Sequence, residues 1–408
     1  MDINKYKYFT DNINYIYENK DIEFINKIES LEVIVKNLIN EIAFESDGVL
    51  AYICLVYCYE CIICLYEERN LHKDMIELGE KAVCLCEDAS LLFPDEIFFK
   101  KSESRLTYIL GRIFNVITET ADSIKYFKKF LSIEINMPDN ETTIDSYYCR
   151  KINIAAYLIH MYSVDLKLLD EAKECLEIAV DWKLKEFLHD IENISVYDEM
   201  FDQYLDYAVN YFMKNNDKES VNKILYNSAL AIEKEYLKDS SGNHLILYLC
   251  ALNITARYAA FLIDNDYSDI DYYVGLTLTR SMELPGNLVA EYGDQLFGLL
   301  KVVYGGVVCP FLIKNKIEFN FMNKLYNSLE YTFKLWDDYY QALVVYKTIY
   351  QMLVNVFDEH IVASKEFAAE ELAQYDGRKS YGSSEFIKLH DKYHNLANQI
   401  DLKIKYIE

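Results

Sequence analysis

The chain has 408 residues, of which 52% are hydrophobic, and a formal net charge of −25 at pH 7. Only 12 residues are glycine and 4 are proline, against ordinary usage of roughly 7% and roughly 5%, which argues against turn-rich and sheet-based folds. A surface this negative repels nucleic-acid phosphates, and we therefore expect no direct DNA or RNA binding. We expect a protein or peptide partner instead. The alternative is that the charge serves solubility alone.

Helical periodicity runs through nearly the whole chain, and the short connections are typical of antiparallel helix pairs. The predicted helices cover residues 3–19, 21–44, 48–69, 74–91, 103–117, 121–134, 145–163, 168–187, 197–214, 218–237, 245–264, 267–282, 288–304, 319–336, 338–357, 361–374 and 383–406. Helix-breaking clusters are predicted at 240–243, 285–287, 305–310 and 377–384. The first predicts a boundary, which gives an N-terminal helical cap (1–45), a first set of repeats (46–239) and C-terminal repeats with capping helices (245–408).

The first residues are polar and acidic, without the apolar stretch of a secretory signal. The ten cysteines fall in helix-like segments, which indicates thiols in a reducing compartment, so we expect a cytoplasmic protein. Residues 49–66 carry one charge, Glu60, and approach the length of a membrane span. Acidic flanks and a charge at the centre favour a buried core helix over a span, and we expect no membrane association.

Four cysteines, Cys54, Cys58, Cys61 and Cys64, fall within eleven residues. Their spacing resembles in part the cluster motif of radical-SAM enzymes, but that motif lies on a loop, and here Glu60 precedes Cys61 where an aromatic residue is usual. On a helix all four thiols share one face. We therefore predict a core face with no metal and no cofactor; a metal or cluster site and a redox sensor are the alternatives.

Three segments resemble the tetratricopeptide pattern, and a fourth resembles it more weakly. They comprise Tyr108, Leu110, Gly111, Phe114, Ser123, Phe127 and Phe130; Ile154, Tyr157, Leu158, Tyr162, Ala172, Leu176 and Ala179; Tyr326, Leu329, Phe333, Ala342, Tyr346 and Ile349; and Leu252, Ala256, Ala259, Ser268 and Tyr272. The resemblance covers about half of the chain. The glycine that is usual in the first helix (helix A) of each tetratricopeptide pair is present only at Gly111. It implies an all-α superhelix, a solenoid of stacked tetratricopeptide-like helix pairs.

The groove of tetratricopeptide proteins is lined by helix-A residues beside the packing positions. Carried over, the resemblance implies peptide- or partner-binding side chains at Arg105, Tyr108, Arg112, Asn115, Asn153, His160, Asn253, Arg257, Lys324, Asn327, Tyr331 and Lys334. None is a carboxylate, and such a wall could hold the carboxylates or backbone amides of an extended peptide. The alternative is that the three arginines pair with acidic residues of neighbouring helices.

We expect a non-enzymatic scaffold or adaptor that holds a protein or peptide segment in this groove. One alternative is a peptide-sensing regulatory receptor that resembles bacterial pheromone receptors, although residues 1–45 lack a basic recognition helix. Another is an acidic mimic of nucleic acid that inhibits a partner protein. The fourth hypothesis is a helical enzyme. His390 and His394 have the spacing of a zinc-binding helix, but no third ligand follows at a familiar spacing. We therefore expect a solvated helix face there.

Overall fold

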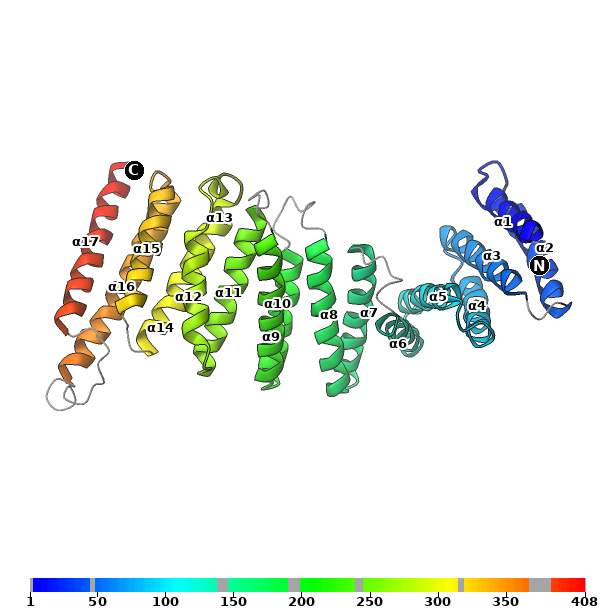
Figure 1. The fold of residues 1–408 in the computed structure, drawn as a ribbon, viewed down its shortest axis with the longest axis horizontal. Coiled ribbons are helices and arrows are strands. Elements are labelled where there is room, and N and C mark those ends of the chain that lie inside the picture. Colours follow the sequence, from blue (N-terminus) through cyan, green and yellow to red (C-terminus); the bar gives the residue numbers. More distant parts are fainter. Residues whose placement is uncertain are drawn as a thin grey trace. The chain divides into compact units, whose positions relative to one another are not determined.

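The computed structural model describes residues 3–44, 48–137, 146–189, 199–238, 245–314, 319–366 and 383–407, which are helical apart from short turns (Figure 1). The all-α prediction is confirmed for these ranges. The chain forms two compact units, residues 1–186 and 187–408. The predicted boundaries after residue 45 and after residue 239 stay predictions, because residues 45–47 and 239–244 lie outside the described ranges.

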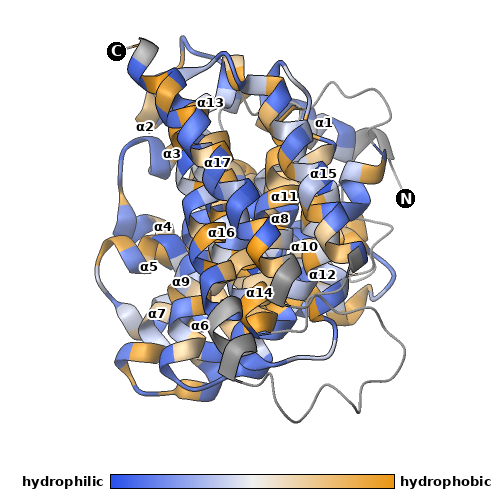
Figure 2. Ribbon diagram, turned by 90° about the vertical axis from the view of Figure 1, so that its left-hand side faces the viewer, coloured by the Kyte–Doolittle hydropathy of each residue, from blue (hydrophilic) through white to orange (hydrophobic). Residues whose placement is uncertain are grey.

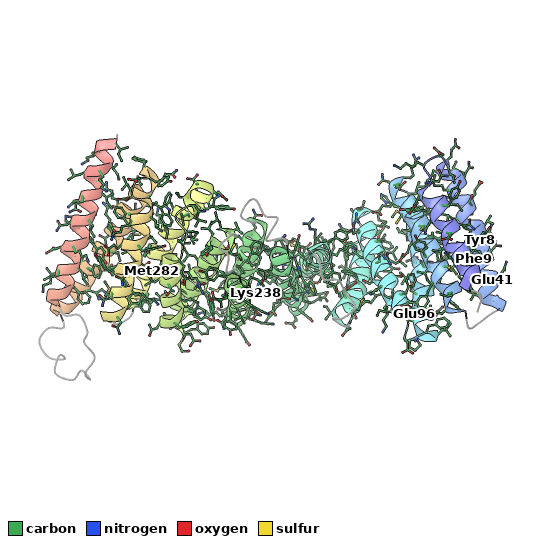
Figure 3. All side chains as sticks on the ribbon, turned by 45° about the horizontal axis from the view of Figure 1, so that its top comes forward. Tyr8, Phe9, Glu41, Glu96, Lys238 and Met282 are labelled. Atoms are coloured by element: carbon green, nitrogen blue, oxygen red, sulfur yellow. The ribbon has the colours of Figure 1, made fainter. Side chains whose placement is uncertain are left out.

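The first unit is a succession of helices joined by short turns. They are α1 (Ile3–Glu18), α2 (Phe24–Phe44), α3 (Val49–Glu68), α4 (His72–Leu92), α5 (Ile97–Val116), α6 (Thr120–Ile135), α7 (Ser146–Asp165) and α8 (Leu169–His189), whose last residues belong to the second unit. Each helix packs on the next one along the chain, as α3 does on α4 and α4 on α5. In the first pair, Phe9 packs against the core while Tyr8, beside it in Figure 3, is 66% exposed.

The second unit continues the same pattern. Its helices are α9 (Glu199–Lys214), α10 (Lys218–Lys238), α11 (Leu245–Asn265), α12 (Ile270–Met282), α13 (Leu288–Lys301), the π-helix η2 (Val302–Val308), α14 (Cys309–Lys314), α15 (Phe319–Trp336), α16 (Tyr340–Glu366) and α17 (Ser383–Ile407). Hydrophobic and hydrophilic residues alternate around helices such as α17 (Figure 2), as helices that bury one face require.

One turn geometry recurs at a regular interval. Asn70, Thr118, Lys167, Asn216 and Asp266 have left-handed φ angles of 55 to 65°, and successive members lie 48, 49, 49 and 50 residues apart. At the first turn, Leu71 N–H donates to the carbonyl of Tyr66 and Asn70 N–H donates to that of Glu67, both at 3.0 Å, which is the Schellman helix ending. The equivalent long bond is present at all five turns. The chain is therefore a helical-repeat protein.

We call the helix before each such turn an A helix and the one after it a B helix, and we extend the same alternation to the helices before the first turn and after the last. The A helices are α1, α3, α5, α7, α9, α11, the continuous α13–η2–α14 segment and α16; the B helices are α2, α4, α6, α8, α10, α12, α15 and α17. Contacts between equivalent helices have nearly the same spacing: Tyr162 donates to Asn115 between A helices, and Ser281 contacts Ser328 between B helices, each pair 47 residues apart. A period of 48–50 residues exceeds the roughly 34 of tetratricopeptide repeats.

The turn predicted at 305–310 is wrong, because the helix continues through it to Lys314; the one kink of this segment lies earlier, at Tyr292. Gly305 lies within the π-helix η2, where a Cβ atom would lie 2.8 Å from Met352 Sδ of α16. This glycine therefore lies against the Met352 side chain of a neighbouring A helix and does not break its own helix. No separate helix begins at residue 361 as predicted, because α16 runs unbroken to Glu366. The predicted turn at 285–287 is confirmed.

The cysteine-rich segment packs in the core of the first unit. Cys54, Cys58 and Cys61 are buried on α3 against α1 and α2, and the Sγ atom of Cys58 lies 3.6 Å from the carbonyl oxygen of Leu31. Burial raises the pKa of the Cys61 thiol to about 12. The core-face prediction is confirmed for these three thiols, whereas Cys64 is half-buried. Within the described ranges, no three His, Cys, Asp or Glu side chains are placed to hold a metal ion.

Three stretches are long and apolar enough to cross a membrane, judged by length and composition: Val49–Glu68, Leu245–Asn265 and Leu288–Lys314. Between 50% and 78% of the most apolar part of each is buried within the fold. At least half of the most apolar part of each stretch therefore packs within the fold.

A candidate binding groove on the A helices of the second unit

A hollow of about 220 Å³ opens to solvent where three successive A helices of the second unit meet. It is lined by Asp202 of α9, Leu249, Asn253 and Arg257 of α11, Gln295 and Leu299 of α13, and Val302 at the start of η2. We call these residues, together with Asp206 of α9, the A-helix groove. Lys238 and Met282, labelled in Figure 3, end the B helices α10 and α12 of the same unit.

Helical spacing brings these side chains to one wall. Leu249, Asn253 and Arg257 follow one another at intervals of four residues, so they point from the same side of α11. Asp202 and Asp206 have the same spacing on α9. The wall therefore presents a polar row on α9 and α11, while the side contributed by α13 and η2 is largely apolar.

A small, more enclosed crevice adjoins the groove and shares Asp202 and Asn253 with it. Its remaining lining is apolar: Phe187, Phe201, Ile232, Cys250 and Ile254. The Phe187 and Phe201 rings stack with centroids 5.7 Å apart. A broader and shallower depression, lined by residues such as Asp338, Leu402 and Lys403, lies where the α15–α16 turn meets α17, and it involves one A helix only. The groove on α9, α11 and α13 is therefore the better candidate site.

The arginine of the groove is held by carboxylates. Arg257 Nη1 donates to Asp206 Oδ1 at 2.8 Å, and its Nη2 atom lies 3.7 Å from Asp202 Oδ2. Arg257 Nε also donates to Asn253 Oδ1 at 3.2 Å, and the Asn253 amide donates to Asp202 at 3.3 Å. The side chain of Asp206 is still 62% exposed, against 25% for Arg257. Among the described lining residues, one guanidinium thus faces two carboxylates, so their formal charges sum to an excess of negative charge.

The predicted arginines of the first unit are paired in the same way. Arg105 Nε lies 3.3 Å from Glu60 Oε1, and Arg112 Nη1 lies 3.6 Å from Glu67 Oε1, so two parallel ion pairs join α5 to α3. Burial raises the pKa of the Glu60 carboxyl, and Arg105 opposes that shift. Of the two sequence-based interpretations of the arginines, internal pairing is the one observed for all three.

Three other predicted residues are buried and have packing roles. Asn153 donates to the carbonyl of Ala179 at 2.7 Å, and His160 Nδ1 lies 2.7 Å from the carbonyl oxygen of Ala172. Tyr108 packs on Phe127 and Phe130, with ring centroids 6.0 and 5.1 Å away.

Asn115 is half-buried on α5, where it accepts the hydrogen bond of Tyr162 on α7. It therefore joins two consecutive A helices of the first unit.

The remaining predicted residues lie on a B helix. The sequence-based comparison treated residues 319–336 as an A helix, but α15 packs on α12, a B helix, through Ser328. The Tyr331 hydroxyl donates to the carbonyl of Leu284, just after α12, at 3.4 Å. Lys334 pairs with Glu330 on its own helix at 2.9 Å, Lys324 is half-buried and Asn327 is exposed. These side chains do not share a surface with the A-helix groove.

Of the twelve predicted residues, the structure thus places Asn253 and Arg257 in the groove. The residues that sequence reasoning missed are Asp202, Asp206, Leu249, Gln295, Leu299 and Val302. A signal for the aspartates was present: Asp202 and Asp206 stand 51 residues before Asn253 and Arg257, close to one repeat period, with the same four-residue spacing.

Comparisons with known proteins identify no relative. No protein-family model matches the sequence, and no curated protein matches it significantly. Among solved structures, the chain is similar to a "circular tandem repeat protein with novel repeat topology and enhanced subunit contact surfaces", at 11% identity over 98% of this chain and 96% of that one, with a TM-score of 0.26. Likeness at this level carries no argument, so the helical-repeat assignment rests on the recurring turns and contacts.

Proposed function

We propose that this protein is a non-enzymatic helical-repeat scaffold of the cytoplasm that binds a protein or peptide segment in the A-helix groove. The observation that carries the proposal is the solvent-open hollow to which α9, α11 and α13 all contribute. Residues from consecutive repeats line it, and stacked repeats commonly present such extended surfaces to partners.

The lining suits a peptide segment. Amide and carboxylate groups of Asn253, Gln295 and Asp202 can bond a ligand's backbone or polar side chains, while Leu249, Leu299 and Val302 offer apolar contact. Binding sites commonly combine an apolar lining with a few placed polar groups. The architecture resembles tetratricopeptide proteins in its stacked helix pairs, although its repeat is longer.

The test is selection of binding peptides from a random twelve-residue library displayed on phage, with the full chain as bait. Selected peptides, made synthetically with a fluorescent label, are titrated by anisotropy. Val302 is 49% exposed, so Val302→Glu places a charge in the groove with little effect on the core. The matched control is Leu230→Glu, at a 56% exposed leucine on the B helix α10.

We expect Val302→Glu to weaken binding at least tenfold and Leu230→Glu to leave it unchanged, since placing a charge among apolar contacts costs more than the roughly 1.4 kcal/mol that corresponds to a tenfold change in affinity. Failure to select any peptide, or equal binding by both variants, contradicts the proposal.

A further inference from the structure

We infer that the A-helix groove selects a segment that carries a basic side chain next to an apolar one, and that it disfavours acidic segments. This inference rests on the proposed function and specifies the ligand class of the same site. It differs from the expectation that arginines in the groove hold carboxylates.

The charge of the wall is the first argument. Among the described residues that line the groove, Arg257 is the cation, and Asp202 and Asp206 both lie within 4 Å of it. A ligand carboxylate at Arg257 must share the guanidinium with these two carboxylates, and like charges at such distances repel. A ligand ammonium or guanidinium beside Asp206 meets an excess carboxylate instead.

The exposure of Asp206 is the second argument. Its side chain is 62% exposed although its Oδ1 atom accepts from Arg257, so this carboxylate borders solvent at the edge of the groove. Asp202 lies one helical turn away and is 19% exposed. A basic side chain that reaches α9 can therefore form a charge-assisted hydrogen bond at Asp206 without entering the core.

The apolar side of the groove gives the third argument. Leu299 of α13 and Val302 of η2 line the hollow on the side away from α9, with α11 between them. Val302 is 49% exposed, so its side chain is accessible to a ligand in the hollow. A segment laid across the three helices thus brings one apolar side chain to Leu299 and Val302 and one basic side chain to Asp206.

The test uses three sets of synthetic nine-residue peptides with blocked ends, equal in leucine and valine content. One set carries Lys and Arg, one carries Asp and Glu, and one carries Ser and Asn. Binding to the full chain is measured by anisotropy at low and high salt, for the wild type, the double variant Asp202→Asn with Asp206→Asn, and the control Asp271→Asn. Asp271 is an exposed aspartate on the B helix α12.

We expect the basic set to bind at least tenfold tighter than the acidic set, with an advantage that shrinks at high salt. The double variant leaves Arg257 without its carboxylates, so it should lose this preference and bind acidic peptides better than the wild type does, while Asp271→Asn behaves as the wild type. Circular dichroism confirms that the variants fold.

Tighter binding of the acidic or neutral set, or an unchanged preference in the double variant, overturns the inference. If such peptides still lose affinity with Val302→Glu, the proposed function stands and only the ligand class is wrong. If no set binds at all, both the inference and the proposed function fail.

Discussion

Arg257 Nη1 donates to Asp206 Oδ1 at 2.8 Å, across consecutive A helices whose paired residues lie 51 positions apart in the sequence. The pair is partly open to solvent, with 62% of the Asp206 side chain exposed. Exposed ion pairs contribute little to stability, because water screens them in the folded state. The main effect of the Arg257–Asp206 pair is therefore on the charge of the groove.

The first prediction concerns the stability of this pair. A double-mutant cycle with Arg257→Gln and Asp206→Asn should give a coupling energy below about 1 kcal/mol, measured by urea unfolding. A coupling above about 2 kcal/mol would show that the pair holds α9 to α11 and has a structural role.

The second prediction concerns the close approach of α5 and α6. A Cβ atom on Gly111 would lie 2.7 Å from Cδ1 of Phe127, a fully buried ring with little room to move. Gly111→Ala should therefore destabilise the protein by about 1–3 kcal/mol. Gly298→Ala is the matched control, since nothing lies within 4 Å of its Cβ position on α13, and it should stabilise the helix by about 0.5–1 kcal/mol. Thermal unfolding of both variants measures the contrast.

The third prediction concerns the recurring turn. Thr118 is exposed and holds a φ of 65°, a left-handed conformation that a β-branched residue rarely adopts. Thr118→Gly removes the steric cost of this conformation and should stabilise the protein by about 1 kcal/mol. Thr118→Ala keeps a Cβ atom and should gain much less. Equal melting temperatures for the glycine and alanine variants would contradict the steric explanation.

The fourth prediction concerns pH. Burial lowers the pKa of His160 below its usual value near 6.5, and the hydrogen bond to the carbonyl of Ala172 only partly offsets the shift. Below pH 6.5 the unfolded chain takes up a proton that the folded chain does not. Stability is therefore lost as the pH falls, by at most about 1.4 kcal/mol per pH unit, until the pH reaches the folded pKa.

His160→Gln should flatten this dependence between pH 7.5 and 5, and His394→Gln, at an exposed imidazole, should leave it in place. Melting temperatures across this range measure both slopes. Parallel slopes for the wild type and His160→Gln would assign the acid sensitivity to other groups.

The fifth prediction concerns thiol reactivity. Cys84 is exposed, whereas Cys58 is fully buried, and burial raises the pKa of the Cys58 thiol, which suppresses the reactive thiolate. Iodoacetamide at pH 8 should alkylate Cys84 within minutes and Cys58 only after unfolding, as mapped by mass spectrometry. Full labelling in guanidinium is the control, and rapid native labelling of Cys58 would mean that α3 separates from α1 and α2.

Several elements were predictable because their signal is local. The helix predicted at 319–336 coincides with α15, and the cysteine segment was correctly predicted to be a core helix. Both predictions succeed because the spacing of apolar side chains around a helix depends only on near neighbours. Gly111 was correctly singled out within a packing motif, and the structure gives its reason in the Phe127 ring.

Other features could not be predicted from the local sequence. The left-handed turns carry Asn, Thr, Lys and Asp instead of glycine, so the most familiar mark of a helix ending is absent and the period of 48–50 residues went unnoticed. Without that period, residues 319–336 were assigned to the wrong helix series. Gly305 and Gly306 predict a turn, and only the structure shows that Gly305 lies within the helical segment η2, against the Met352 side chain of α16.

The sequence by itself determined that the chain is helical, that Cys54, Cys58 and Cys61 lie in a core and that the chain is acidic, because composition and periodicity are properties of adjacent residues. Only the tertiary structure decided which carboxylates stand beside Arg105, Arg112 and Arg257. Those partners lie 45 to 55 residues away and become neighbours only when the repeats stack. Electrostatic energy depends on distances in space, so the charge of the A-helix groove is set by stacking and not by α11 alone.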